Sequence, residues 1–137
     1  MIRDVKVKTK MAQKWAVVRK LESSLSIQPV VPGSGVVDMS APVESYNLIL
    51  VLAYSVLDEV LKQLMAQGEF KYKRLAGLEW MMKKSLNNNL PWQNYNFVNL
   101  GRKARNKLAH EAELVPKGDC VTHTNAIEVE LKAWGVI

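Results

Sequence analysis

The 137-residue chain contains a single cysteine, Cys120, and lacks a hydrophobic run long enough to cross a membrane. One cysteine excludes an intramolecular disulfide, and no set of cysteine and histidine residues has the spacing of a zinc site. The most apolar run, residues 48–57, is about half the length of a membrane span and is followed by Asp58 and Glu59. The N-terminus also lacks the apolar segment and cleavage site of a signal peptide. We therefore expect a cytoplasmic protein that uses no metal or cofactor and does not enter a membrane.

The sequence also has no segment in which apolar and polar residues alternate with the period of two that marks a strand. Apolar residues instead recur at steps of three and four, the pattern of amphipathic helices. This periodicity predicts an all-α fold, a bundle of four or five helices in one domain over residues 1–137. The first expected helix carries the apolar positions from Val7 to Leu25. The next three span about 41–67, 70–86 and 92–114, and the fifth runs from Asp119 or Thr122 to Gly135.

Helix-breaking residues divide these segments. Two prolines and two glycines predict a loop over residues 26–40, between the first and second helices. Ser40 is a candidate N-cap for the second helix, which should end at Gly68. This helix is apolar nearly all round over residues 48–61, so it should be the central helix or face a partner subunit. The expected apolar side of the third helix consists of Tyr72, Leu75, Leu78 and Met82.

The net charge of +6 is unevenly distributed along the chain. Two basic segments, residues 1–25 and 69–110, alternate with two acidic ones. Their most regular groups are Lys6, Lys10 and Lys14 on the first helix, and Lys71, Lys73, Arg74, Lys83 and Lys84 around the third. Such groups are either solvated helix faces or a surface for an anionic partner such as nucleic acid.

The stretch RKARNKLAHEAEL, residues 102–114, places a histidine and an asparagine on one helix face. Asn106 and His110 are four residues apart and therefore stack one above the other. The long side chains of Arg102 and Arg105 reach the same area of the surface. A histidine can move a proton near neutral pH, and a guanidinium group can hold a phosphate with two hydrogen bonds. These are the groups that cleavage of a phosphodiester needs.

Arg105, Asn106 and His110 fit the pattern R-N-x-x-x-H, which resembles the signature of the HEPN superfamily (higher eukaryotes and prokaryotes nucleotide-binding). The expected order of helices over residues 40–137 is also similar to that family. The resemblance implies a metal-independent endoribonuclease, of the toxin–antitoxin or anti-phage defence type, whose site forms where two protomers meet. It implies that His110 moves the protons of 2′-OH attack, that Arg105 holds the scissile phosphate and that Asn106 orients the site.

Basic residues around the motif and on the third helix are expected to bind the RNA. They are Arg102, Lys103, Lys107, Lys83 and Lys84. The expected partners are thus RNA, a second copy of the chain in a homodimer, and an antitoxin or defence-system protein. Two alternatives stay open. One is a non-catalytic interaction or nucleic-acid-binding protein of the same fold, and the other is a DNA-binding regulator that uses the basic first helix.

Other conspicuous side chains are interpreted as packing or surface residues. The four tryptophans lie on apolar stripes and are assigned to packing, with Trp92 and Tyr95 as alternatives that could flank the site. His123 has no partner at a useful spacing and is interpreted as a surface residue without a role. Cys120 has no neighbouring base in the sequence and is expected to be inert.

Overall fold

The computed structural model describes residues 2–25 and 41–137, which form five α-helices and contain no strand. The helices are α1 (Val5–Leu25), α2 (Val43–Ala66), α3 (Leu78–Asn87), α4 (Tyr95–Glu111) and α5 (Lys117–Ala133). The predicted all-α helical bundle is therefore confirmed. None of these helices is both long enough and apolar enough to cross a membrane. The predicted loop over residues 26–40, with the N-cap at Ser40, lies outside the described residues.

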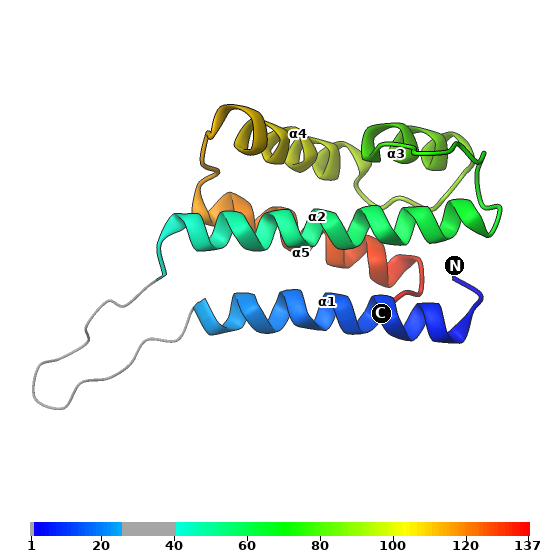
Figure 1. The fold of residues 1–137 in the computed structure, drawn as a ribbon, viewed down its shortest axis with the longest axis horizontal. Coiled ribbons are helices and arrows are strands. Elements are labelled where there is room, and N and C mark those ends of the chain that lie inside the picture. The colour runs from blue at the N-terminus through cyan, green and yellow to red at the C-terminus, as the bar shows by residue number, and fades with distance from the viewer. Residues whose placement is uncertain (1, 26–40) are drawn as a thin grey trace, which may run out of the picture.

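Helix α2 is the centre of the bundle (Figure 1). Helix α1 lies on one side of α2, α3 and α4 follow one another along the opposite side, and α5 packs against α2 between them. Leu50, Leu57, Leu61 and Leu64 of α2 have no exposed surface. The prediction of a central helix is therefore confirmed. The outer surface of α1 faces away from the outer surface that α3 and α4 form together.

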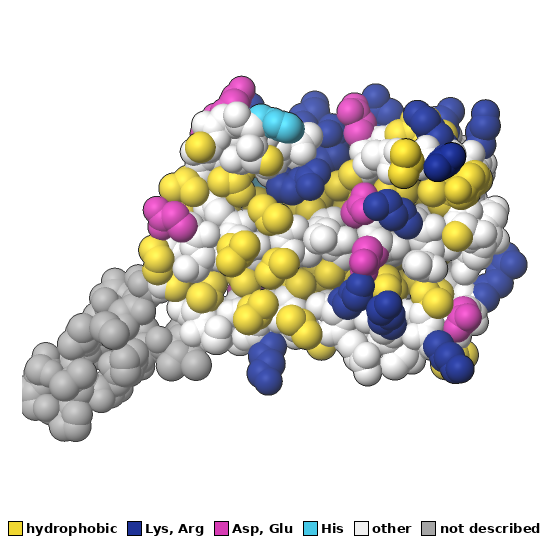
Figure 2. All heavy atoms as spheres, in the orientation of Figure 1, with side chains coloured by type: hydrophobic (Ala, Val, Ile, Leu, Met, Phe, Trp, Pro, Cys, Tyr) yellow, Lys and Arg dark blue, Asp and Glu magenta, His cyan; other side chains and the backbone are white. Residues whose placement is uncertain are grey.

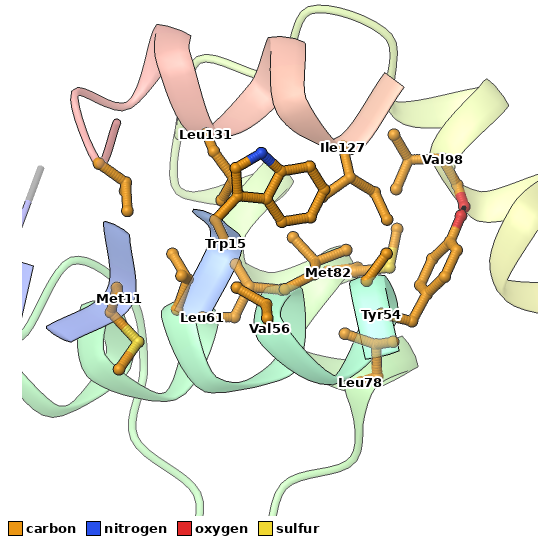
Figure 3. Packing of buried hydrophobic residues seen from close by; sticks show 14 of the residues in the cluster. Met11, Trp15, Tyr54, Val56, Leu61, Leu78, Met82, Val98, Ile127 and Leu131 are labelled. Carbon is orange, nitrogen blue, oxygen red and sulfur yellow. Dashed lines mark hydrogen bonds between the residues drawn. The ribbon is translucent and has the colours of Figure 1, made fainter. Parts of the chain in front are cut away.

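The core between α1, α2 and α5 is built around Trp15, whose indole ring lies beside Ile127 and Leu131 of α5 (Figure 3). The indole Nε1 donates a 3.0 Å hydrogen bond to Oε1 of Glu128. Arg19 also donates to this carboxylate, with 2.9 Å between Nη2 and Oε2. Bonds to an ionised group are stronger than neutral ones, so this cluster fixes α1 against α5.

The helix ends follow local capping signals. The Asp4 side chain accepts hydrogen bonds from the backbone N–H groups two and three residues later, which caps the start of α1. Asn94 caps α4 in the same way. Gly68 (φ 92°) and Gly135 (φ 69°) adopt the left-handed conformation that glycine favours, just beyond α2 and α5. The predicted ends of these two helices are therefore confirmed.

The third helix is shorter than predicted, because it begins at Leu78 rather than near residue 70. The chain instead crosses from α2 to α3 in a non-helical connection, whose two ends are anchored by the buried side chains of Phe70 and Ala76. Tyr72 is 65% exposed and Leu75 is 91% exposed, so the prediction that they belong to an apolar side was wrong. The other two predicted positions on that side are buried as expected.

The connection between α4 and α5 also differs from the prediction. Helix α4 ends at Glu111, where Ala112 adopts a left-handed conformation (φ 52°), and α5 begins at Lys117, earlier than either predicted start. The buried amide of Asn47 on α2 explains this turn. It donates to the carbonyl of Val115 and accepts from the N–H of Val115, both at 2.8 Å. The backbone at Val115 is thus held by α2 and cannot continue a helix.

Candidate functional site

Helix α4, which carries the motif, begins at a buried carboxylate of α5. Glu130 has no exposed surface, and its oxygens accept hydrogen bonds from the backbone N–H groups of Gln93 and Asn94 at 2.8–2.9 Å. Burial raises the pKa of Glu130, and the two backbone donors oppose this shift. The carboxylate therefore fixes the point at which α4 starts.

A glycine lets the middle of α4 lie directly on α2 and α5. A Cβ atom at Gly101 would lie 2.0 Å from Oη of Tyr54 and 2.7 Å from Nδ1 of His123. The Tyr54 hydroxyl donates a 2.6 Å hydrogen bond to the carbonyl of Val98 (Figure 3). Burial raises the pKa of Tyr54, so the hydroxyl keeps its proton at neutral pH. The position of α4, and hence of the motif, depends on this close contact.

His123 is buried, which corrects its interpretation as a surface residue. Its side chain is 8% exposed, and its ring stacks on Phe97 with 4.6 Å between the ring centres. Its Nδ1 atom is buried without a hydrogen-bond partner. Burial lowers the pKa of His123, although Asp119 acts in the opposite direction. His123 is thus a neutral packing residue between α5 and α4.

The burial of His123 predicts a pH dependence of stability. The unfolded chain binds a proton at this ring below about pH 6.5, whereas the folded protein keeps the ring neutral to lower pH. The free energy of unfolding should therefore be highest above about pH 6.5 and fall below it, by at most about 1.4 kcal/mol per pH unit from this residue. Urea unfolding at about pH 7.5 and pH 5.5 measures the change. His123→Gln should make the free energy of unfolding depend less on pH. An equal change between the two pH values in both proteins would contradict this prediction.

Arg105 is half-buried beside α2 and carries a charge that no carboxylate balances in the described part of the chain. Its Nη2 donates a 3.1 Å hydrogen bond to Oδ1 of Asn106, and its guanidinium carbon lies 5.9 Å from the centre of the Tyr54 ring. Its Nε is buried without a partner. By contrast, Arg19 and Arg102 each form an ion pair with a glutamate. Arg105 therefore carries a charge without a counterion. Its Nε is too buried to meet an anion from solvent, so such a ligand would contact the Nη groups.

His110 is exposed, one helical turn beyond Asn106 and close to the C-terminal end of α4. Residues four apart share a helix face and lie about 6 Å apart along the axis. Arg105 is hydrogen-bonded to Asn106, the residue that shares a helix face with His110, so the asparagine lies between the cation and the histidine. A histidine side chain is visible on the surface over α4, with Lys and Arg side chains near it (Figure 2). This arrangement can bind a phosphate at Arg105 and exchange a proton at His110.

Arg102, which the sequence placed at the same site, lies elsewhere. Arg102 is only 6% exposed. Its Nε donates a 2.9 Å hydrogen bond to Oδ1 of Asn99, and its Nη2 lies 3.8 Å from Oε1 of Glu79 on α3. Contrary to the prediction, Arg102 is a structural contact between α4 and α3 rather than an exposed RNA ligand.

Lys103 and Lys107 are exposed on α4 and line a groove between α4 and α5. The groove has a volume of about 360 Å³, and Leu100 contributes to its apolar lining. Glu113, which follows α4, and Asp119 of α5 also line the groove. The lysines of α4 are therefore the part of the groove that suits a phosphate. They lie seven and three residues before His110, so they are on the same side of the helix as the motif histidine.

The remaining predicted RNA-binding residues, Lys83 and Lys84, lie on α3. Lys83 is exposed and forms a 3.3 Å ion pair with Glu79, while the Nζ of Lys84 lies 5.8 Å from the centre of the Trp80 ring. The pKa of Glu79 is lowered, first by the hydrogen bond from Lys83 and then by charges on α4, including that of Lys103. Cations of α3 and α4 thus gather around one carboxylate.

Trp92 and Tyr95 do not flank the motif. The Trp92 ring meets Tyr95 and Trp134 edge-on, with ring centres 5.2 and 4.8 Å apart, and its Nε1 donates to Oγ of Ser85 at 3.0 Å. Tyr95 is the first residue of α4, so this cluster lies at the opposite end of the helix from the motif. Cys120 is buried, and burial raises its pKa to about 11, so it carries no thiolate at neutral pH.

The fold and the site together define an all-α bundle with an arginine, an asparagine and a histidine on one exposed helix. The chain matches no protein-family model, no curated protein and no solved structure.

Proposed function

We propose that this protein is a metal-independent endoribonuclease of the HEPN type, with Arg105, Asn106 and His110 as its site. The observation that supports this most is the unbalanced charge of Arg105. A half-buried cation without a carboxylate is stabilised by an anionic ligand, because burial weakens its solvation. An exposed histidine one turn away from the amide that holds this cation can exchange a proton with the same ligand. An RNA phosphodiester supplies both the anion and a neighbouring 2′-OH.

The proposed reaction is an internal transfer at phosphorus. A neutral His110 removes the proton from the 2′-OH, and the 2′ oxygen then bonds to phosphorus. The bond from phosphorus to the 5′ oxygen breaks, and that oxygen receives a proton from a second, protonated histidine. Arg105 stabilises the charge on the non-bridging oxygens, and Asn106 holds the guanidinium group in place. The products are a 2′,3′-cyclic phosphate and a 5′-OH.

Two histidines per site require two chains, because each chain has two histidines and one of them, His123, is buried. We therefore expect a symmetric dimer in which the motif surfaces of two subunits meet. Light scattering at micromolar concentration should give twice the chain mass of 15.5 kDa. A monomer under these conditions would contradict the shared site and leave the second proton without a donor.

The direct test incubates the purified protein with single-stranded and looped RNAs in the presence of a chelator, because an exposed backbone can adopt the in-line geometry of 2′-OH attack. We expect cleavage, fragments that end in a 2′,3′-cyclic phosphate, and no cleavage of a DNA strand of the same sequence, which lacks the nucleophile. Activity that requires added magnesium, or that extends to DNA, would contradict the proposal.

A second candidate is a nucleic-acid-binding protein without catalysis. It is favoured by the exposed lysines of α3 and α4, Lys83, Lys103 and Lys107, which attract a polyanion whatever the motif does. It predicts RNA binding without cleavage. A DNA-binding role for α1 has less support, because Lys14 forms an ion pair with Glu59 and this helix lies on the side of α2 away from the motif (Figure 1).

A further inference from the structure

The connection between α2 and α3 displays five consecutive exposed side chains, residues 71–75, which read Lys-Tyr-Lys-Arg-Leu. Phe70 and Ala76 on either side are buried, so the two ends of this segment are fixed to the core. Between them, Tyr72 is 65% exposed and Leu75 is 91% exposed. The structure therefore holds an aromatic ring, an aliphatic side chain and three cations in solvent.

Neither of these apolar side chains stabilises the fold. Leu75 has φ 55°, a left-handed conformation that is unfavourable for leucine, and its side chain buries almost nothing in return. Tyr72 likewise has no ring contact and no hydrogen bond within the described chain. An exposed aromatic ring beside several cations provides the two kinds of group with which proteins hold single-stranded nucleic acid.

The charge of this segment continues onto α3 and α4. The Nζ atoms of Lys73 and Lys84 lie 5.3 and 5.8 Å from the centre of the Trp80 ring, which joins the segment to α3. Lys83 of α3 and Arg102 of α4 then both form ion pairs with Glu79. Lys and Arg side chains gather along the edge of the molecule formed by α3 and α4, and a histidine lies over α4 on the same edge (Figure 2).

We propose that residues 71–75 form a second contact for single-stranded RNA, in which Tyr72 stacks on an unpaired base while Lys71 and Arg74 neutralise backbone phosphates. This inference rests on the proposed function, since it takes the bound strand to be the substrate. A strand is favoured over a membrane surface because Lys and Arg side chains gather along the edge of the molecule formed by α3 and α4, which suits a linear polyanion (Figure 2). Stacking on an exposed tyrosine beside cations is a general way to hold unpaired bases.

The test measures binding apart from cleavage. A fluorescent 2′-O-methyl oligouridine has no free 2′-OH and cannot be cleaved, and His110→Ala serves as the common background. Tyr72→Ala should weaken its binding about tenfold, whereas Tyr72→Phe keeps the ring and should retain most of the affinity. Val129→Ala removes another exposed apolar side chain, which is 52% exposed and lies on α5, and is the matched control. Lys71→Ala and Arg74→Ala should each make the affinity less dependent on salt, by about 0.7 in the logarithmic slope.

The outcomes separate this inference from the proposed function. Unchanged affinity in Tyr72→Ala, with the fold intact by circular dichroism, overturns the stacking contact. Binding to vesicles that contain phosphatidylserine, without binding to the oligonucleotide, overturns it in favour of a membrane surface. If Tyr72→Ala weakens binding although the unmodified protein never cleaves RNA, the contact stands and the proposed catalysis fails.

Discussion

Replacement of His110 by alanine should lower the rate of RNA cleavage by at least about 100-fold, the usual effect of removing a general acid or base. The side chain is exposed, so its removal leaves no cavity and the helix should persist. In the proposed reaction, His110 is the group that accepts the proton of the 2′-OH, and its copy in the second subunit protonates the leaving oxygen. The rate is measured with a labelled RNA in a chelator, and circular dichroism verifies the fold.

The structure also determines which control is suitable. His123 is the other histidine, but it is buried against α4, so its replacement would disturb the helix that carries the site. Glu111→Ala is a better match, because Glu111 is exposed, adjacent in sequence and directed to another face of α4. This variant should cleave RNA like the unmodified protein. Persistent cleavage by His110→Ala would place the reaction at another site, and an equal loss in Glu111→Ala would point to disturbance of the helix end.

The helix pattern was predictable wherever local signals agreed with the core. The apolar stretch of α2 predicted its central place, and Gly68 and Gly135 ended helices as expected. The start of the third helix was not predictable in this way. Residues 70–77 have apolar positions at helical spacing, but the chain buries Phe70 and Ala76 and leaves Tyr72 in solvent. The position of the end of α2 determines which of these residues reaches the core. The spacing of apolar residues along the sequence does not give that position.

The candidate site was likewise predictable only in part. Spacing placed Asn106 and His110 on one helix face, but it could not distinguish Arg102 from Arg105, which are three residues apart. Glu79, which belongs to α3, distinguishes them, because it pairs with Arg102 and leaves Arg105 without a carboxylate. Long-range ion pairs of this kind are set by the packing of helices. The pattern of residues 102–110 therefore could not predict this ion pair.

One residue in the sequence, Gly101, is related to the burial of His123. A glycine within a helical segment costs helix stability and usually has a packing reason. Here the reason is the close approach of α4 to Tyr54 and His123. The glycine therefore indicated a close helix contact, although the sequence could not name the side chains on the other side.

Gly101→Ala should lower the free energy of unfolding by about 1–3 kcal/mol, since the added methyl group would meet Oη of Tyr54 at 2.0 Å and the His123 ring at 2.7 Å. Both rings are buried, and the Tyr54 hydroxyl is bonded to Val98, so neither can move away without cost. The higher helix propensity of alanine offsets only up to about 1 kcal/mol of this loss. Displacement of α4 should also lower RNA cleavage, because the motif moves with the helix.

Gly118→Ala is the matched control, because a Cβ atom at Gly118, in the first turn of α5, would meet nothing within 4 Å. It should leave stability unchanged or raise it by up to about 1 kcal/mol. Urea unfolding gives both values. Tyr54→Phe removes the oxygen nearest to the added methyl group, so it should cost less stability in the Gly101→Ala background than in the unmodified protein. Strict additivity of the two changes, or a Gly101→Ala protein as stable as the Gly118→Ala control, would show that α4 does not rest on Tyr54 as the structure has it.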